Sequence, residues 1–394
     1  MLSALIPSPT DPILELIQEF REDLRADKLD FGVGVYKDSS GQTIIPRAVK
    51  MAETRLLEQQ DTKTYLGLLG DVEFNQAMAD LVLDNSVARD RVSAIQTAGG
   101  SGALWLMLGL AKKANPDMVL WLSTPSWGNH QAIATGLNIP VKRYSYFDPA
   151  TRDVVFDAMC ADLSAAGPND VVLLHGCCHN PTGANLKLEN WQTLTDMALA
   201  QGFLPFIDIA YQGFGDGLDE DASGLRSMAA RVPEMLIATS CSKNFGLYRD
   251  RTGCGLALSS TASAQQTTLS NMMTLMRISI SMPPDHGAAV VRTILKDPEL
   301  RSIWDAELTG MRTRMLTLRS SLADALRSRT NSDRFDFMAR HRGMFSLIGA
   351  TPEQAMALKK DHAIYIVSDG RMNVAGLKED RIEDVAAAFA AVGL

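Results

Sequence analysis

The run LIATSCSKNFGLYRDR, residues 236–251, joins an apolar stretch to a cluster of hydroxyl and basic side chains. The apolar residues 236–238 are typical of a buried strand. Lys243 follows at the mouth of this predicted strand, with serines before it and Arg251 after it. An amine placed there can bind an aldehyde cofactor, while its neighbours bind the phosphate of that cofactor. A single lysine is more often a solvated surface charge, so other motifs must support this hypothesis.

Short apolar runs alternate with helical patterns on both sides of this segment. The clearest predicted strands are 119–122, 171–174, 204–209, 236–240 and 255–258. This alternation favours the α/β class, with a mostly parallel sheet covered by helices on both faces.

The two ends of the chain predict a second, smaller α+β unit. The predicted elements are an extended arm at 1–12, a helix at 13–24, a strand and loop at 31–38, a long helix at 307–329, strand-like runs at 344–350 and 363–376, and a closing helix at 379–392. Because 394 residues are long for one core, we expect two domains. We assign 13–44 and 311–394 to the small domain and 45–310 to the large domain.

Composition excludes several classes of protein. A net charge of −8 gives no electrostatic footprint for nucleic acid, and no run approaches the ~20 apolar residues of a membrane span. Residues 1–20 lack the pattern of a signal peptide. The five cysteines, two of them adjacent, do not form a disulfide framework, which predicts reduced core thiols and a cytoplasmic location.

Three further motifs carry candidate chemistry. GGSGALWLMLGLAKK, residues 99–113, places Gly100 and Ser101 at the start of a predicted helix, where free N–H groups suit a phosphate. FLPFIDIAYQGF, residues 203–214, places Asp208 inside an apolar strand. A buried carboxylate needs a partner, either a structural one or the protonated ring nitrogen of a cofactor.

The third motif, VVLLHGCCHNPTG at residues 171–183, has a rival interpretation as a zinc site. His175, Cys177, Cys178 and His179 are metal-ligand types. An extended chain, however, points residue 178 away from 175, 177 and 179, which does not close a tetrahedral cage. We therefore predict no metal, and we expect the NPTG turn to leave Asn180 at the end of the strand.

Together, these motifs resemble the pyridoxal 5'-phosphate (PLP) sites of the class I, fold type I aminotransferases, in the aspartate and aromatic amino-acid branch. The resemblance extends from Gly34 to Arg371 and implies a large domain with a mostly parallel seven-stranded sheet. It implies that Lys243 binds PLP as an aldimine and moves the α-proton, in a ping-pong transamination. The other cofactor-binding residues that it implies are Gly100, Ser101, Trp127, His130, Asn180, Asp208, Tyr211, Ser240, Ser242 and Arg251.

The same resemblance implies a homodimer with shared active sites. Tyr65 would reach the phosphate of the neighbouring subunit, and Arg277 would bind a side-chain carboxylate across the interface. Arg371, with the backbone of Gly34, would bind the α-carboxylate, and Trp127 and Asn180 would also contact the substrate. Tyr65 and Tyr211 join Lys243 and Asp208 as predicted catalytic residues.

Departures from aspartate-specific enzymes bear on the substrate. Ser101, Thr64 and Met282 replace residues that are usually threonine, asparagine and asparagine, and Leu68 and Leu69 make the region after Tyr65 more apolar. We therefore predict transamination of phenylalanine, tyrosine and tryptophan with 2-oxoglutarate, with aspartate and glutamate also accepted. The alternatives are a narrow aspartate aminotransferase, another PLP reaction such as decarboxylation, and a non-catalytic regulator.

Overall fold

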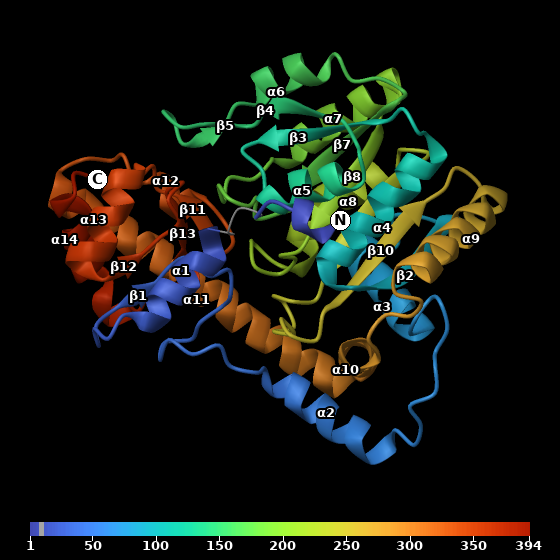
Figure 1. The fold of residues 1–394 in the computed structure, drawn as a ribbon, viewed down its shortest axis with the longest axis horizontal. Helices are drawn as coiled ribbons and strands as arrows, with labels where there is room; N and C mark the ends of the chain where they lie inside the picture. Colours follow the sequence, from blue (N-terminus) through green and yellow to red (C-terminus); the bar gives the residue numbers. More distant parts are fainter. Residues whose placement is uncertain (8–11) are drawn as a thin grey trace. The chain divides into compact units, whose positions relative to one another are not determined.

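The computed structural model describes residues 1–7 and 12–394, which divide into two compact units (Figure 1). Unit 1 comprises residues 1–43 and 315–394, and unit 2 comprises residues 44–314. Residues 8–11 of the predicted N-terminal arm lie outside the described part of the chain.

Unit 2 contains one seven-stranded sheet. Its strands, in spatial order, are β2 (Val92–Ala98), β10 (Thr252–Leu258), β9 (Met235–Ser240), β8 (Leu204–Ile209), β7 (Asp170–His175), β3 (Val119–Thr124) and β4 (Val141–Ser145). Only β10 runs antiparallel to its neighbours, β2 and β9. The predicted α/β class and the mostly parallel sheet are therefore confirmed. The edge strand β4 was not among the predicted strands, because the exposed Lys142 and Arg143 interrupt its apolar residues. Charged side chains are common on the edge strands of sheets.

Helices flank this sheet (Figure 1). They are α2 (Arg47–Gln59), α3 (Val72–Leu83), α4 (Gly99–Ala114), α5 (Gly128–Gly136), α6 (Phe156–Leu163), α7 (Leu188–Gln201), α8 (Leu218–Ala229), α9 (Ala262–Ser279) and α10 (Asp285–Lys296), with a short turn η2 (Arg89–Arg91) and a small β5 (Phe147–Asp148) and β6 (Asp153–Val154) pair. Alternate residues of β9, Leu236 and Ala238, share a buried core with Leu104 and Leu108 of α4. The apolar side of α4 thus covers one face of the sheet, and its N-terminus lies at the end of β2.

Unit 1 has the predicted α+β composition. Its elements are η1 (Leu2–Ala4), α1 (Pro12–Glu22), β1 (Leu29–Asp30), α12 (Phe337–Arg340), β11 (Phe345–Leu347), α13 (Pro352–His362), β12 (Ile364–Tyr365), β13 (Arg371–Asn373), η3 (Val374–Gly376), η4 (Glu379–Arg381) and α14 (Ile382–Ala391). The long helix α11 (Pro298–Thr330) begins in unit 2 and ends in unit 1. Strand β1 pairs in parallel with β12, and β11 pairs antiparallel with β13.

Two predicted elements of unit 1 are wrong. Residues 2–4 form a 3-10 turn, although an extended arm was predicted there. The predicted strand at 31–38 is a loop, and the strand lies earlier, at residues 29–30. The side chain of Asp30 accepts hydrogen bonds from the backbone N–H groups of Gly32 and Val33, so the chain turns directly after β1.

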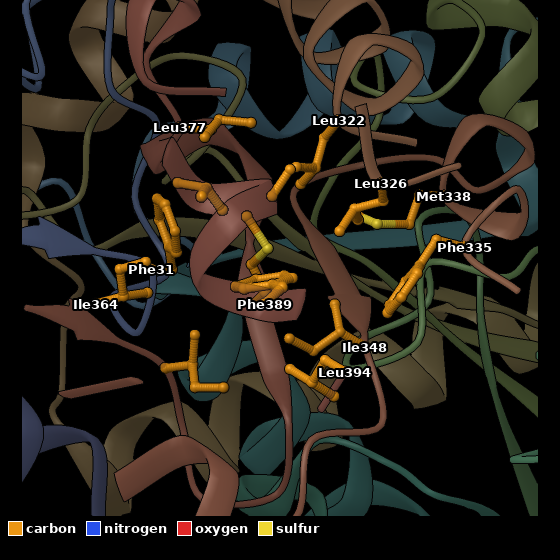
Figure 2. Packing of buried hydrophobic residues seen from close by; sticks show 14 of the residues in the cluster. Phe31, Leu322, Leu326, Phe335, Met338, Ile348, Ile364, Leu377, Phe389 and Leu394 are labelled. Carbon is orange, nitrogen blue, oxygen red and sulfur yellow. The ribbon is translucent and has the colours of Figure 1, made fainter. Parts of the chain in front are cut away.

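Figure 2 shows the core of unit 1. Phe389 of α14 is fully buried, and Phe31 and Leu322 belong to the same cluster. Each such apolar side chain contributes ~1.5–3 kcal/mol on burial. Phe31 therefore anchors the start of the loop that contains Gly34.

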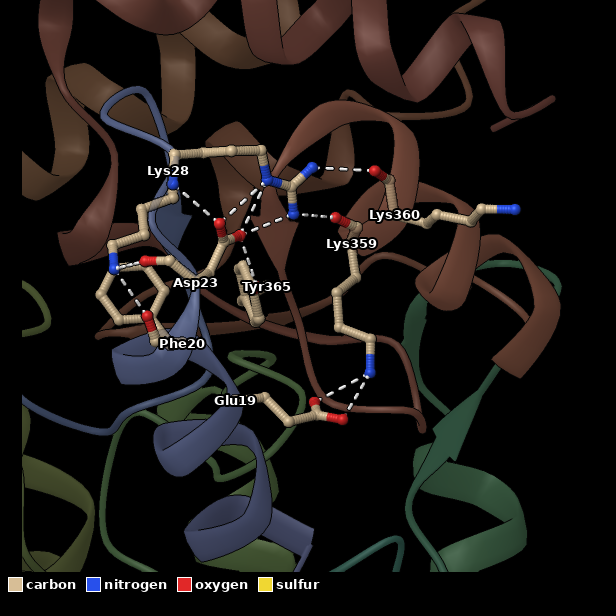
Figure 3. A network of polar contacts seen from close by, with 8 residues as sticks. Glu19, Phe20, Asp23, Lys28, Lys359, Lys360 and Tyr365 are labelled. Carbon is tan, nitrogen blue, oxygen red and sulfur yellow. Dashed lines mark hydrogen bonds and ion pairs between the residues drawn. The ribbon is translucent and has the colours of Figure 1, made fainter.

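A polar network holds α1 against α13 and β12 within unit 1 (Figure 3). Arg25 forms an ion pair with Asp23 and donates to the carbonyl oxygens of Lys359 and Lys360, both at 2.8 Å. These carbonyls lie at the C-terminal end of α13, where they lack intrahelical partners. Hydrogen bonds from Arg25 and Tyr365 hold the pKa of Asp23 well below its usual range.

Candidate active site

The sheet of unit 2 brings most of the predicted cofactor-binding residues to one edge. In order along the chain, Gly100 follows β2, Trp127 follows β3, Asn180 follows β7, Tyr211 follows β8 and Lys243 follows β9. Arg251 immediately precedes β10, whose antiparallel direction starts it at the same edge. Ligands of open α/β sheets bind at the carboxyl ends of parallel strands.

Lys243 is partly buried in the turn that follows β9. Its Nζ lies 4.9 Å from the centre of the Tyr211 ring. Burial lowers the pKa of Lys243 from 10.5 to about 8; the negative charge of Asp208 opposes this change and the positive charge of Arg251 adds to it. This amine therefore loses its proton more easily than an ordinary lysine, as a nucleophile or a general base requires.

Asp208 is held by a chain of hydrogen bonds. Its Oδ2 lies 2.8 Å from Nε2 of His130, and Nδ1 of His130 lies 2.9 Å from Oγ of Ser126. Burial alone would raise the pKa of Asp208. The hydrogen bond with His130, together with the positive charge of Lys243, outweighs this effect, so the net pKa of Asp208 is lowered. Asp208 is therefore an ionised carboxylate at neutral pH, placed to hold a protonated ring nitrogen.

Ser126 and His175 also belong to the cluster around Asp208, a role that the sequence did not predict for either residue. His175 pairs with Asp208 in the register of β7 and β8, and its ring centre lies 5.1 Å from that of His130. Burial and the neighbouring His130 lower the pKa of His175 to about 3, so its ring is neutral. Ser126 precedes α5 and its N-cap Trp127, so the i,i+4 spacing rule for helices does not predict its contact with His130. The rings of Trp127 and His130 pack edge to face, with their centres 5.3 Å apart.

The start of α4 forms a cradle with Arg251 and Ser240. Gly99 has φ +70°, and a Cβ there would lie 2.5 Å from Nη2 of Arg251. A Cβ on Gly100 would lie 3.0 Å from Cβ of Ser240. The helix has no side-chain cap at Ala98, which leaves its first N–H groups for another acceptor. N–H groups, hydroxyls and a guanidinium together fit a phosphate group.

The other members of the predicted phosphate site lie close to this cradle. The backbone N–H of Ser242 donates to Oγ of Ser240 at 3.2 Å, so the turn after β9 folds back towards the end of that strand. Oγ of Ser101 accepts a long hydrogen bond, 3.4 Å, from Nδ2 of Asn129 on α5. The structure thus brings Gly100, Ser101, Ser240, Ser242 and Arg251 to one end of the sheet.

Asn180 lies in a buried turn with a cis peptide bond to Pro181. Its backbone N–H points to Nδ1 of His175 at 3.5 Å. The N–H of Gly183 donates to the carbonyl of His179 at 2.7 Å and closes the turn. The backbone of Asn180 therefore lies beside His175, at the strand end next to the Asp208 group.

Residues 175–179 do not form the extended chain on which the prediction against a zinc site was based. Strand β7 ends at His175, and Cys178 has φ +50°, so the chain is not extended over residues 175–179. The ligand atoms of Cys177, Cys178 and Asp221 lie within 4.8 Å of one another. Asp221, however, already accepts three backbone N–H groups, from Gly213, Gly215 and Asp216, which ties it to that loop.

Tyr65 and Arg277 lie on neighbouring exposed segments of unit 2. Tyr65 is 86% exposed, and the next residue, Leu66, points its backbone N–H at Sδ of Met282, 3.1 Å away. Arg277, near the end of α9, donates a long hydrogen bond, 3.4 Å, to Oγ of Ser281. By contrast, Lys243 and Asp208 are partly buried.

Unit 1 contains the other predicted substrate residues. Arg371 is buried on β13, and its Nη2 donates to the carbonyl of Gly32 at 3.3 Å. The guanidinium lies 4.6 Å from the centre of the Phe345 ring. A Cβ on Gly34 would lie 3.1 Å from Cζ of the same ring, so the loop approaches Phe345 closely. Asn373 fixes this loop by donating to the carbonyls of Val33 and Val35.

The α/β fold, with a lysine of low pKa, a buried carboxylate and a phosphate cradle at one sheet edge, defines an enzyme of the PLP-dependent type. A family model described as aminotransferase class I and II matches residues 26–389, and the chain belongs to this family. The protein is therefore an aminotransferase, and the predicted family and enzyme class are confirmed.

Individual relatives agree with this assignment. The chain is 52% identical to an aromatic-amino-acid aminotransferase of Paracoccus denitrificans and 41% identical to an aspartate aminotransferase of Escherichia coli, with each alignment covering 100% of both chains. A solved aromatic-amino-acid aminotransferase from Burkholderia pseudomallei, described as covalently bound to pyridoxal phosphate, is 37% identical with a TM-score of 0.97, over 100% of this chain and 99% of that one. Within residues 1–7 and 12–394, no helix is long and apolar enough to cross a membrane.

Proposed function

We propose that this chain is a PLP-dependent aminotransferase that transfers the amino group of phenylalanine, tyrosine and tryptophan to 2-oxoglutarate, and that also accepts aspartate and glutamate. The observation that carries the cofactor assignment is the grouping of Lys243, Asp208 and the phosphate cradle at one sheet edge. The full-length identity of 52% to an aromatic-amino-acid aminotransferase supports the substrate class.

The residues of unit 2 fit PLP group by group. Lys243 would hold the cofactor covalently, and the cradle of Gly99, Gly100 and Arg251 would hold its phosphate. Asp208 would bind the ring nitrogen, since His130 keeps this carboxylate ionised. Asn180 and Tyr211 would donate hydrogen bonds to the ring oxygen.

When bound, PLP supplies an electron sink for the charge that develops when the α-proton of the substrate leaves. The chain supplies the proton chemistry. Lys243 removes and returns the α-proton as general base and acid, a role that suits a pKa of about 8. Asp208 keeps the ring nitrogen protonated throughout, because its negative charge is not neutralised by a proton of its own.

Two arginines are proposed to recognise the substrate. We propose that Arg371, beside the Gly34 loop, binds the α-carboxylate through its planar pair of donors. Arg277 would bind a side-chain carboxylate, and its exposure and single long hydrogen bond leave it able to move away when a ring is bound. Leu66 and Met282 lie on the same segments, where the backbone N–H of Leu66 points at Sδ of Met282.

A homodimer with shared sites is part of this proposal. Tyr65 is 86% exposed in the isolated chain, which is unusual for a catalytic side chain unless a second copy covers it. We therefore assign Tyr65 and Arg277 to the site of the partner subunit. We also propose that units 1 and 2 are the small and large domains of the family fold, and that the protein is cytoplasmic, as five free thiols favour a reducing compartment.

Two experiments test the proposal. Borohydride reduction of the cofactor-loaded protein, followed by peptide mapping, should place the pyridoxyl label on Lys243; a label on another lysine contradicts the mechanism. A steady-state panel of phenylalanine, tyrosine, tryptophan, aspartate and glutamate with 2-oxoglutarate then tests the substrate class. Negligible turnover of phenylalanine would favour a narrow aspartate aminotransferase instead.

A further inference from the structure

Arg319 of α11 is a buried cation that the proposed mechanism does not use. It is 0% exposed, and its guanidinium donates to the carbonyls of Gly343 at 2.8 Å and Phe345 at 2.6 Å and to Oγ of Ser346 at 2.7 Å. A buried charge is costly unless its donors are bonded, and these short bonds recover that cost. Arg319 therefore fixes the backbone around β11.

The segment that Arg319 fixes carries the ring of Phe345. This ring lies 4.6 Å from the guanidinium of Arg371 and close to the backbone of Gly34. Strand β11 also pairs with β13, where Leu347 is opposite Arg371. The carbonyl that accepts the shortest bond from Arg319 belongs to Phe345 itself, so a shift of that bond moves the ring directly.

We propose that Arg319 is a positioning residue for recognition of the α-carboxylate. By holding the backbone of Phe345, it keeps the ring centre 4.6 Å from the central carbon of the Arg371 guanidinium, so that the ring covers one side of this group. The carboxylate must then approach the edge of the guanidinium, where its paired N–H donors lie. This inference rests on the proposed role of Arg371 in binding the α-carboxylate.

Arg319→Lys is the decisive substitution. It keeps the positive charge but replaces the planar fork by a single ammonium group, which cannot hold Gly343, Phe345 and Ser346 in the same geometry. Phe345→Leu removes the ring and leaves the backbone acceptors in place. Arg329→Lys, an exposed arginine on the same helix with an ion pair to Glu383, is the matched control.

The experiment measures binding of 3-phenylpropionate to the cofactor-loaded protein by calorimetry. This probe has a ring and a carboxylate but no amine, so it is not turned over. Thermal unfolding and cofactor absorbance show that each variant is folded and loaded at the assay temperature. We expect the Kd to rise about tenfold in Arg319→Lys and in Phe345→Leu, and to stay unchanged in Arg329→Lys.

The double variant distinguishes positioning from independent structural damage. If Arg319 acts through Phe345, adding Arg319→Lys to Phe345→Leu should weaken binding little further; additive losses overturn the proposal. An unchanged Kd in Arg319→Lys also overturns it. If Arg319→Lys does not fold, an unchanged Kd in Phe345→Leu still refutes it. Arg371→Leu is measured alongside, because a normal Kd in that variant contradicts the proposed function of Arg371 itself.

Discussion

Replacing Asp208 by asparagine tests the centre of the proposed mechanism. The substitution keeps the shape of the side chain and allows a hydrogen bond with His130, which lies 2.8 Å from the carboxylate. It removes the negative charge that the surroundings of Asp208 maintain by lowering its pKa. The fold should therefore survive, while the site loses its ability to keep a ring nitrogen protonated.

The size of the effect follows from the burial of the pair. Removing one partner of a buried, hydrogen-bonded charge pair costs ~2–5 kcal/mol. At about 1.36 kcal/mol per factor of ten, this corresponds to a fall in kcat/KM of about 30- to 5,000-fold. Because the ring nitrogen serves every substrate, the losses for phenylalanine and aspartate should be similar.

The assay is steady-state kinetics of Asp208→Asn at saturating PLP, with cofactor occupancy measured by absorbance. Asp117→Asn, a substitution of an exposed aspartate before β3, is the matched control and should behave as wild type. A fully loaded Asp208→Asn protein that turns over at nearly the wild-type rate would refute the role of Asp208.

Further predictions concern substrate charge, the subunit interface and pH. Arg277→Leu should lower kcat/KM for aspartate by a factor that corresponds to ~2–5 kcal/mol, while kcat/KM for phenylalanine should stay within about tenfold of wild type. Arg371→Leu should lower kcat/KM for both substrates, and equal losses for the two substrates in Arg277→Leu would contradict a mobile arginine. Mixing inactive Lys243→Ala with Arg277→Ala should restore some activity towards aspartate through hybrid dimers, and no recovery after verified subunit exchange would exclude shared sites. Lys243→Met should stabilise the cofactor-free protein below pH 8, because both folded and unfolded wild-type chains carry the charge there and only the folded one buries it. This gain in stability should shrink as the pH rises from about 8 towards 10.5, because the folded wild-type chain loses the charge of Lys243 in this range before the unfolded chain does. If denaturant titrations show a gain that does not depend on pH, the charge of Lys243 is not responsible.

Much of the fold followed from local patterns. The central strands of unit 2 are apolar runs bounded by turns, and such runs have few alternatives to a buried strand. The loop after β1 was harder to predict, because its apolar residues alternate as in a strand. The side chain of Asp30 nevertheless turns the backbone at Gly32 and Val33. A single side-chain acceptor thus decided between two conformations that the pattern alone did not separate.

The sequence alone determined the family, and it identified Lys243 and the motif residues around it as the candidates for the chemistry, since each motif combines residue types that the reaction needs at a fixed local spacing. Tertiary structure decided how those residues are tuned. The register of β7 against β8 places His175 beside Asp208, and the fold of unit 1 places Phe345 against Arg371. A pKa depends on the charges and burial around a group, and these come from strands and helices far apart in the chain. The shifted pKa values of Lys243 and Asp208 are therefore properties of the folded protein, although the residues themselves can be identified from the sequence.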